Sequence, residues 1–272
     1  MSEQGLATHL SGTNESNYYG HTIGAAWGDL DNDGDFDHVA ANLAHPRFFD
    51  FSDKTQILMN DGSGIYTDNA GDWETPESAN GLRYQETHSV PVLADIDQDG
   101  ALDLAITCVY NGRPSDFYWG VGNGTFTLDA YHAGITTENG WGAAVADFDH
   151  DGDMDLFADV LFENTLAEAA KGHWLQARAV GVTANRAALG ATVKVTTGTT
   201  TRMRHVQGGT GKGGQDSLYL HFGLGDATSV DQIEVVFPGG NTVTYPGPIN
   251  VDQRVWLFED STTAQPGWAD PS

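Results

Sequence analysis

One nine-residue pattern occurs three times in this chain and constrains its fold more than any other feature. The pattern is D-x-D-x-D-G-x-x-D, and its copies begin at Asp29, Asp95 and Asp147. The starts are 66 and 52 residues apart, which is typical of a repeated unit whose outer loops vary in length. The first 165 residues are therefore predicted to form a repeat domain.

The chemistry of this pattern points to calcium, a hard cation that takes about six to eight oxygen ligands in flexible geometry. Carboxylates at positions 1, 3 and 5 of a tight loop can converge on one ion, and glycine at position 6 permits the sharp bend. Position 7 offers its backbone carbonyl, and the aspartate at position 9 closes the cage. We therefore predict about three Ca²⁺ sites, with these metal-binding residues: Asp29, Asp31, Asp33, Asp35, Asp37, Asp95, Asp97, Asp99, Ala101, Asp103, Asp147, Asp149, Asp151, Asp153 and Asp155.

Two other interpretations of the pattern are weaker. An EF-hand would need Glu at position 12 and a helix on each side, but position 12 is Ala40, Ile106 or Ala158 and the flanking residues are β-like. A metal-free Asp/Gly turn is possible for a single copy. Three copies that all keep their carboxylates argue against it, because unneutralised carboxylates in one loop repel each other. We therefore predict calcium-binding hairpins.

The acidic charge of the chain is confined to its first part. The formal net charge is −26, and residues 1–170 hold 30 acidic and 4 basic residues, whereas residues 171–272 hold 8 of each. Such an acidic surface repels nucleic acid and anionic lipid, so we expect neither a nucleic-acid partner nor membrane insertion. Disorder is disfavoured because Trp, Phe, Leu, Ile and Val are interleaved with the carboxylates.

The segments between the Asp-rich loops indicate propeller blades. Residues 58–66 and 119–126 each read as strand, glycine turn and strand. A full unit is therefore strand, calcium hairpin, strand, strand, turn and strand, which is one four-stranded blade. Two units are complete, and the third stops after its second strand. Closed propellers need about four to eight blades, so open edges must be covered by the second domain, by further sequence or by another copy of the chain.

The second half of the chain predicts a different β domain. Residues 166–171 are the most helix-like stretch and are predicted to form a short linker. Alternating apolar residues then predict strands at 174–180, 191–197, 217–222, 232–237, 242–245 and 254–258. The predicted fold is all-β: β-propeller-like blades with calcium hairpin loops in an incomplete propeller over 1–165, a β-sandwich-like domain over 166–260, and a C-terminal tail over 261–272.

These motifs resemble two known families. Residues 18–165 resemble the FG-GAP/VCBS repeats of integrin-α-type β-propellers, in which the loop aspartates bind calcium. Residues 172–259 resemble the ASPIC/UnbV module, through G-H-W-L at 172–175, N-R-A-A-L-G-A at 185–191, Q-D-S-L at 215–218 and H-F-G-L-G at 221–225. That module commonly follows such repeats in secreted acidic proteins of the cartilage acidic protein type. The resemblance implies an extracellular or cell-surface location, although no signal peptide is visible in this chain.

No motif predicts catalysis. The chain lacks a G-x-S-x-G elbow and an H-E-x-x-H pair, and metal binding explains the clustered aspartates. The glycine-rich run 208–214 is not a Walker A motif, because Gly213 replaces the required Ser or Thr, and we expect a flexible loop there. We expect a non-enzymatic, calcium-binding extracellular structural or adhesive protein that self-assembles into a homo-oligomer or filament and has a protein or glycan ligand. The alternative is an accessory binding module of a secreted hydrolase or lyase.

Overall fold

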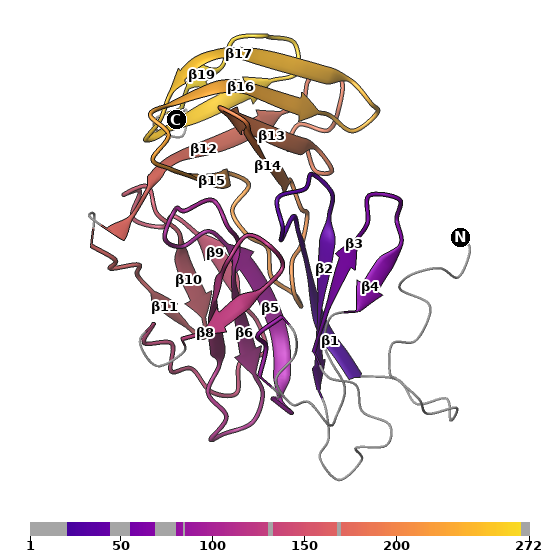
Figure 1. Ribbon diagram of the computed structural model, residues 1–272, viewed down its shortest axis with the longest axis vertical. Coiled ribbons are helices and arrows are strands. Elements are labelled where there is room, and N and C mark those ends of the chain that lie inside the picture. Colours follow the sequence, from indigo (N-terminus) through magenta and orange to yellow (C-terminus); the bar gives the residue numbers. More distant parts are fainter. Residues whose placement is uncertain are drawn as a thin grey trace.

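The computed structural model describes residues 21–43, 55–68, 80–83, 85–129, 133–167 and 170–267. These residues form strands, turns and loops without an α-helix, which confirms the all-β prediction. Figure 1 shows small sheets in the N-terminal part and a two-sheet sandwich above them. Residues 1–20 of the predicted repeat domain and residues 268–272 of the predicted tail lie outside the described residues. The described part also contains no helix long and apolar enough to cross a membrane.

The first two blades have the predicted organisation. Each is a four-stranded antiparallel sheet whose strand order follows the sequence, and the Asp-rich loop joins its first two strands. Blade 1 contains β1 (His21–Gly28), β2 (Asp37–Leu43), β3 (Gln56–Asn60) and β4 (Tyr66–Asp68). Blade 2 contains β5 (His88–Ala94), β6 (Asp103–Cys108), β7 (Asp116–Gly120) and β8 (Phe126–Leu128).

Blade 3 has one strand more than the sequence predicted. Its strands are β9 (Ala144–Ala146), β10 (Asp155–Ala158) and β11 (Val160–Phe162), and β10 lies in the middle. The extra strand forms because Asp159, at φ 67°, reverses the chain between β10 and β11. A fourth strand is absent among the described residues, so β11 is an edge strand. The described part of the repeat half forms three blades, fewer than the roughly four to eight of a closed propeller, which confirms the incomplete propeller.

The C-terminal half is a β-sandwich, as predicted. One sheet has the order β15-β12-β18-β19 and the other β14-β13-β16-β17. Fully buried side chains from both sheets, such as Phe222 and Ile233, form one core between them. The strands are β12 (His173–Val180), β13 (Thr192–Thr197), β14 (Thr200–His205), β15 (Leu220–Gly225), β16 (Ser229–Val236), β17 (Thr242–Asn250), β18 (Gln253–Phe258) and β19 (Gln265–Pro266).

The connection between the two halves includes the stretch predicted to be helix-like. Ala170 N donates a 2.7 Å hydrogen bond to Ala167 O. Residues 168 and 169 lie outside the described residues, and 163–167 form neither helix nor strand. The chain thus passes from blade 3 to β12 through a short connection.

A long loop, residues 206–219 between β14 and β15, covers the inner edges of the open propeller. The first strands of the three blades, β1, β5 and β9, lie side by side. The loop forms hydrogen bonds to β1 and to β9: Gly211 N donates to Ala25 O at 3.2 Å, and Ser217 N donates to Val145 O at 3.0 Å. Glycine permits this approach, since a Cβ on Gly211 would lie 2.2 Å from Val90 Cγ1. The glycine-rich segment that we expected to be flexible is therefore packed against the blades.

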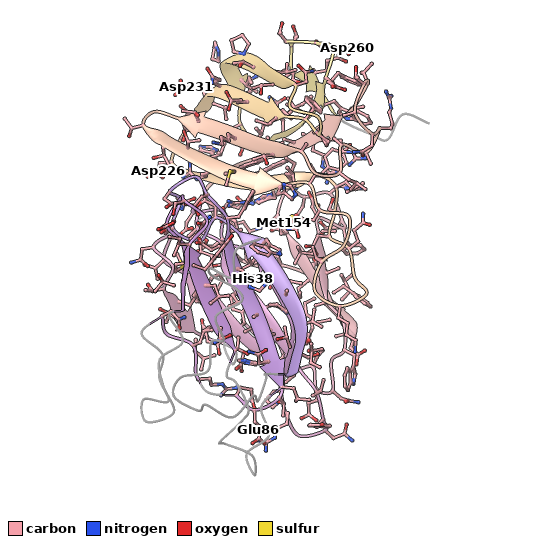
Figure 2. The ribbon with its side chains drawn as sticks, turned by 90° about the vertical axis from the view of Figure 1, so that its right-hand side faces the viewer. His38, Glu86, Met154, Asp226, Asp231 and Asp260 are labelled. Carbon is pink, nitrogen blue, oxygen red and sulfur yellow. The ribbon has the colours of Figure 1, made fainter. Side chains whose placement is uncertain are left out.

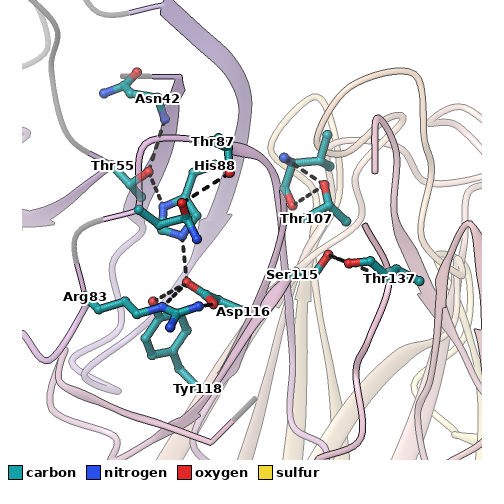
Figure 3. A network of polar contacts seen from close by, with 12 residues as sticks. Asn42, Thr55, Arg83, Thr87, His88, Thr107, Ser115, Asp116, Tyr118 and Thr137 are labelled. Carbon is teal, nitrogen blue, oxygen red and sulfur yellow. Dashed lines mark hydrogen bonds and ion pairs between the residues drawn. The ribbon is translucent and has the colours of Figure 1, made fainter. Parts of the chain in front are cut away.

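A buried polar network links blades 1 and 2 (Figure 3). His88 Nδ1 lies 2.7 Å from Thr55 Oγ1, and His88 Nε2 lies 3.1 Å from Asp116 Oδ2. Arg83 donates to both oxygens of Asp116, with a distance of 3.0 Å from its Nε. Burial raises the pKa of Asp116, but the hydrogen bonds from His88 and Arg83 outweigh that effect and hold the pKa below its ordinary value.

Candidate metal centres

The three Asp-rich hairpins share one backbone conformation. We number their positions 1 to 9 and name them loop 1 (29–37), loop 2 (95–103) and loop 3 (147–155). The glycines at position 6 have φ between 97° and 103°, and position 4 also has positive φ, at Asn32, Gln98 and His150. A side chain at position 6 would be strained, so glycine is required there. This repeated bend turns the carboxylates of each loop toward one point.

The carboxylates converge as the pattern predicted. In each loop three of them place an oxygen within 4.8 Å of the others. Positions 1, 3 and 5 do so in loops 1 and 2, whereas positions 1, 3 and 9 do so in loop 3. The groups are Asp29, Asp31 and Asp33; Asp95, Asp97 and Asp99; and Asp147, Asp149 and Asp155.

The position-1 aspartates fit a bound cation. Each has one buried carboxylate oxygen without a hydrogen-bond partner in the described part of the chain: Asp29 Oδ2, Asp95 Oδ1 and Asp147 Oδ1. A buried, unpaired carboxylate oxygen is costly unless a donor or a cation faces it. Because all the donors are hard oxygens, calcium fits better than zinc or copper.

The raised pKa values of the loop aspartates also fit a bound cation. Burial raises the pKa of Asp29 to about 6 and that of Asp95 to about 7, although Arg204 acts against the rise in both. Burial likewise raises the pKa of Asp37 to about 7 and that of Asp103 well above its ordinary value. Neighbouring carboxylates contribute to each rise. A bound Ca²⁺ would supply the opposite charge that these groups need to stay ionised.

The aspartates at position 9 have a second role that the sequence did not reveal. Asp37 accepts hydrogen bonds of 2.8 Å from Leu30 N at position 2 and from Asn60 N at the end of the third strand. The same pair of bonds recurs in loops 2 and 3, at 2.8–2.9 Å, on Asp103 and Asp155. In loops 1 and 2 this residue therefore fastens the loop to the third strand of its blade, and in loop 3 it fastens the loop to Asn164, two residues after β11. Each oxygen keeps a further lone pair for a cation.

Position 7 differs among the loops. Ala101 has no donor atom in its side chain, so only its carbonyl can contribute, as predicted for this position. Asp153 is buried and forms an ion pair with Lys171, which lies in the connection to the sandwich. Asp35 forms no ion pair among the described residues, and burial raises its pKa. The side chain at position 7 thus joins the two halves only in loop 3.

Loops 2 and 3 contact the sandwich directly. Gly223 N donates to Asp95 Oδ2 at 2.9 Å, and Arg254 Nη2 donates to Asp147 Oδ2 at 2.8 Å. Figure 2 places Met154 of loop 3 near the junction between the halves and Glu86, just before β5, at the far end of the repeat part. No motif of the sequence identified these contacts, since they join residues far apart in the chain.

Comparisons with known proteins match two segments. Residues 95–158, which span loops 2 and 3, match the FG-GAP-like repeat, and residues 181–264 match the ASPIC and UnbV family. No curated protein matches the chain. The matched segments lie within the blades and the sandwich, in the predicted order. The chain therefore contains an FG-GAP-like repeat followed by an ASPIC and UnbV domain, as its motifs predicted.

Proposed function

We propose that this protein is a calcium-binding extracellular structural protein whose repeat half is held rigid by three Ca²⁺ ions. The observation that carries the proposal is the buried, unpartnered oxygen at position 1 of each loop, on Asp29, Asp95 and Asp147. Each belongs to a converging set of carboxylates. FG-GAP and ASPIC/UnbV domains are β-rich modules of an extracellular type, which supports a location outside the cell or on its surface.

Calcium titration of the full chain tests this proposal. After EDTA treatment and dialysis, isothermal titration calorimetry should show about three Ca²⁺ ions per chain. Magnesium should compete poorly, because it demands a small octahedral site and keeps its waters. A chain that is folded and binds no calcium at millimolar concentration would refute the proposal.

The proposed role is not catalytic. Thr55, His88 and Asp116 follow one another in the order of a nucleophile, a base and an orienting acid. All three are buried, and Asp116 is also paired with Arg83, so this group is better suited to joining the blades than to reaching a substrate. We propose instead that the protein acts as an adhesive scaffold with a protein or glycan ligand.

Self-association is the second part of the proposal, and the edge strand β11 supports it. Val160 and Leu161 on this strand are 53% and 44% exposed, and every copy of the chain carries the same edge. Exposed edge strands recruit a further strand. Light scattering at micromolar protein in millimolar calcium should show assemblies that Leu161→Lys abolishes. A strict monomer under these conditions would refute self-association.

A cavity between blades 2 and 3 supports the alternative role as an accessory binding module. It has a volume of about 270 Å³ and is lined by Phe117, Trp119, Ile135 and Met154, with Asp129 accepting a 2.8 Å hydrogen bond from Trp119 Nε1. Apolar cavities with a few polar groups are typical ligand sites. A glycan screen read by tryptophan fluorescence tests this role, with Trp119→Phe as the control.

A further inference from the structure

The sandwich packs on two of the three calcium loops and leaves the bend of the other open. A Cβ on Gly152, at position 6 of loop 3, would lie 2.2 Å from Trp174 Cζ2. A Cβ on Gly100, at the same position of loop 2, would lie 2.2 Å from Arg202 Nε. A Cβ on Gly34 in loop 1 would meet nothing within 4 Å. The three bends are alike in conformation, so the difference lies in what covers them.

The hydrogen bonds to position 1 show the same difference. Asp147 Oδ2 accepts from Gln176 Nε2 at 2.7 Å and from Arg254 Nη2 at 2.8 Å, and Arg254 Nε donates to Gln176 Oε1 at 2.7 Å. Asp95 Oδ2 accepts from the backbone of Gly223 at 2.9 Å. In both aspartates the sandwich fixes one oxygen, and the other oxygen stays without a partner.

Loop 1 lacks this support. Asp29 Oδ1 accepts a 3.1 Å hydrogen bond from Asp33 N, within its own loop. The sandwich touches loop 1 through the ring contact of His205 with Phe36, and Arg204 acts on Asp29 through its charge. Among the described residues, no hydrogen bond from the sandwich to the Asp29 carboxylate accompanies these contacts.

On the basis of the proposed calcium function, we propose that the sandwich positions the calcium ligands of loops 2 and 3, so that calcium binding there and docking of the sandwich strengthen each other. Groups that hold a ligand from behind typically change metal affinity about 10- to 100-fold. Such coupling is reciprocal, so each event stabilises the other. The site in loop 1 should bind calcium independently of docking.

Calcium binding and docking strengthen each other because the sandwich contacts the loops in their bent conformation. Gly225 N donates to Gln98 O at 3.0 Å and Gly172 N to Asp97 O at 3.3 Å, and Trp174 lies on the bare backbone of Gly152. These backbone surfaces exist only when the loop has its tight, positive-φ bend. Calcium favours that bend by gathering the carboxylates, and it therefore presents the surface on which the sandwich docks.

Calorimetric calcium titration of full-length Trp174→Ala tests the inference, because Trp174 contacts loop 3 without belonging to the predicted ligands. The calcium affinity of one of the three sites, the one in loop 3, should fall about tenfold. Trp256→Ala is the matched control: Trp256 is also a half-buried tryptophan of the same sheet, but it packs on Phe258 and Tyr219. All three sites should keep wild-type affinity in this control.

Unchanged affinity at every site in folded Trp174→Ala would overturn the inference. If that variant does not fold, Trp174→Phe keeps an aromatic ring in the strand and should weaken the same site less, and unchanged affinity would again overturn it.

A second measurement is proteolysis of the connection between the halves in calcium. Asp149→Ala in loop 3 should accelerate cleavage, and Asp31→Ala, at the same position of loop 1, should not. Equal rates would also overturn the inference. Wild-type protein that binds no calcium would instead refute the proposed function itself.

Discussion

Arg254 donates a 2.8 Å hydrogen bond to Asp147, which precedes it by 107 residues. The arginine lies on β18 of the sandwich, and the aspartate occupies the first position of loop 3. The sandwich also places Arg202 on loop 2 and Arg204 within 3.9 Å of Asp95. Residues 171–272 carry no formal net charge, but three of their arginines lie against the acidic loops 2 and 3. The Asp-rich loops are therefore both candidate metal centres and the surface that joins the two halves.

The individual ligand positions can be separated by mutation. Asp97→Ala removes a position-3 carboxylate from loop 2 and should reduce the calcium stoichiometry from about three to about two. Asp35→Ala alters position 7, where loop 2 naturally has Ala101, and it should leave the stoichiometry unchanged because the backbone carbonyl remains. Equilibrium dialysis with calcium measures both. Equal stoichiometry in the two variants would contradict the ligand assignment.

Asp153 should matter for stability rather than for calcium. Asp153→Ala removes the buried ion pair with Lys171, and breaking such a pair typically costs about 3 kcal/mol of unfolding free energy. Asp35 occupies the same position in loop 1 and forms no such pair among the described residues. Asp35→Ala should therefore lower the free energy of unfolding much less. Urea unfolding in saturating calcium measures the difference. Similar losses in both variants would mean that the link to Lys171 contributes nothing.

The buried network of Asp116 predicts that the free energy of unfolding falls at acid pH. Its pKa is held below the ordinary 3.8, so the folded state binds this proton less tightly than the unfolded chain does. The stabilisation is therefore present above about pH 4 and is lost as the pH falls through the folded pKa. Asp116→Asn should cost about 2–3 kcal/mol at pH 7.

The gap in unfolding free energy between wild type and Asp116→Asn should narrow as the pH falls below about 4. Chemical denaturation at several pH values measures it, with calcium saturating throughout. A gap that stays constant with pH would show that the charge of Asp116 is not what stabilises the network.

The sequence predicted the features that depend on neighbouring residues. The bend of each Asp-rich loop follows from aspartates and glycine within nine positions, and alternating apolar residues predicted most strands. β14 was missed because T-T-R-M-R-H contains a single apolar residue. The three-residue strand β11 is too short for its pattern to stand out.

Contacts between distant segments could not be predicted in the same way. The path of residues 206–219 along β1 and β9 depends on how the sandwich sits above the blades, as does the contact of Trp174 with Gly152. A glycine-rich run is compatible with either a free loop or a close backbone approach. Composition alone does not decide between them, whereas the packing of Gly211 against Val90 does.

The melting temperature in calcium and in EDTA tests the central claim most directly. Each site should stabilise the fold by about 2.7 kcal/mol when free calcium is 100 times the dissociation constant. Saturating calcium should therefore raise the melting temperature markedly above that in EDTA, and magnesium at the same concentration should restore little of the difference. Identical melting curves in calcium and in EDTA, with metal analysis confirming that the calcium was removed, would contradict the account.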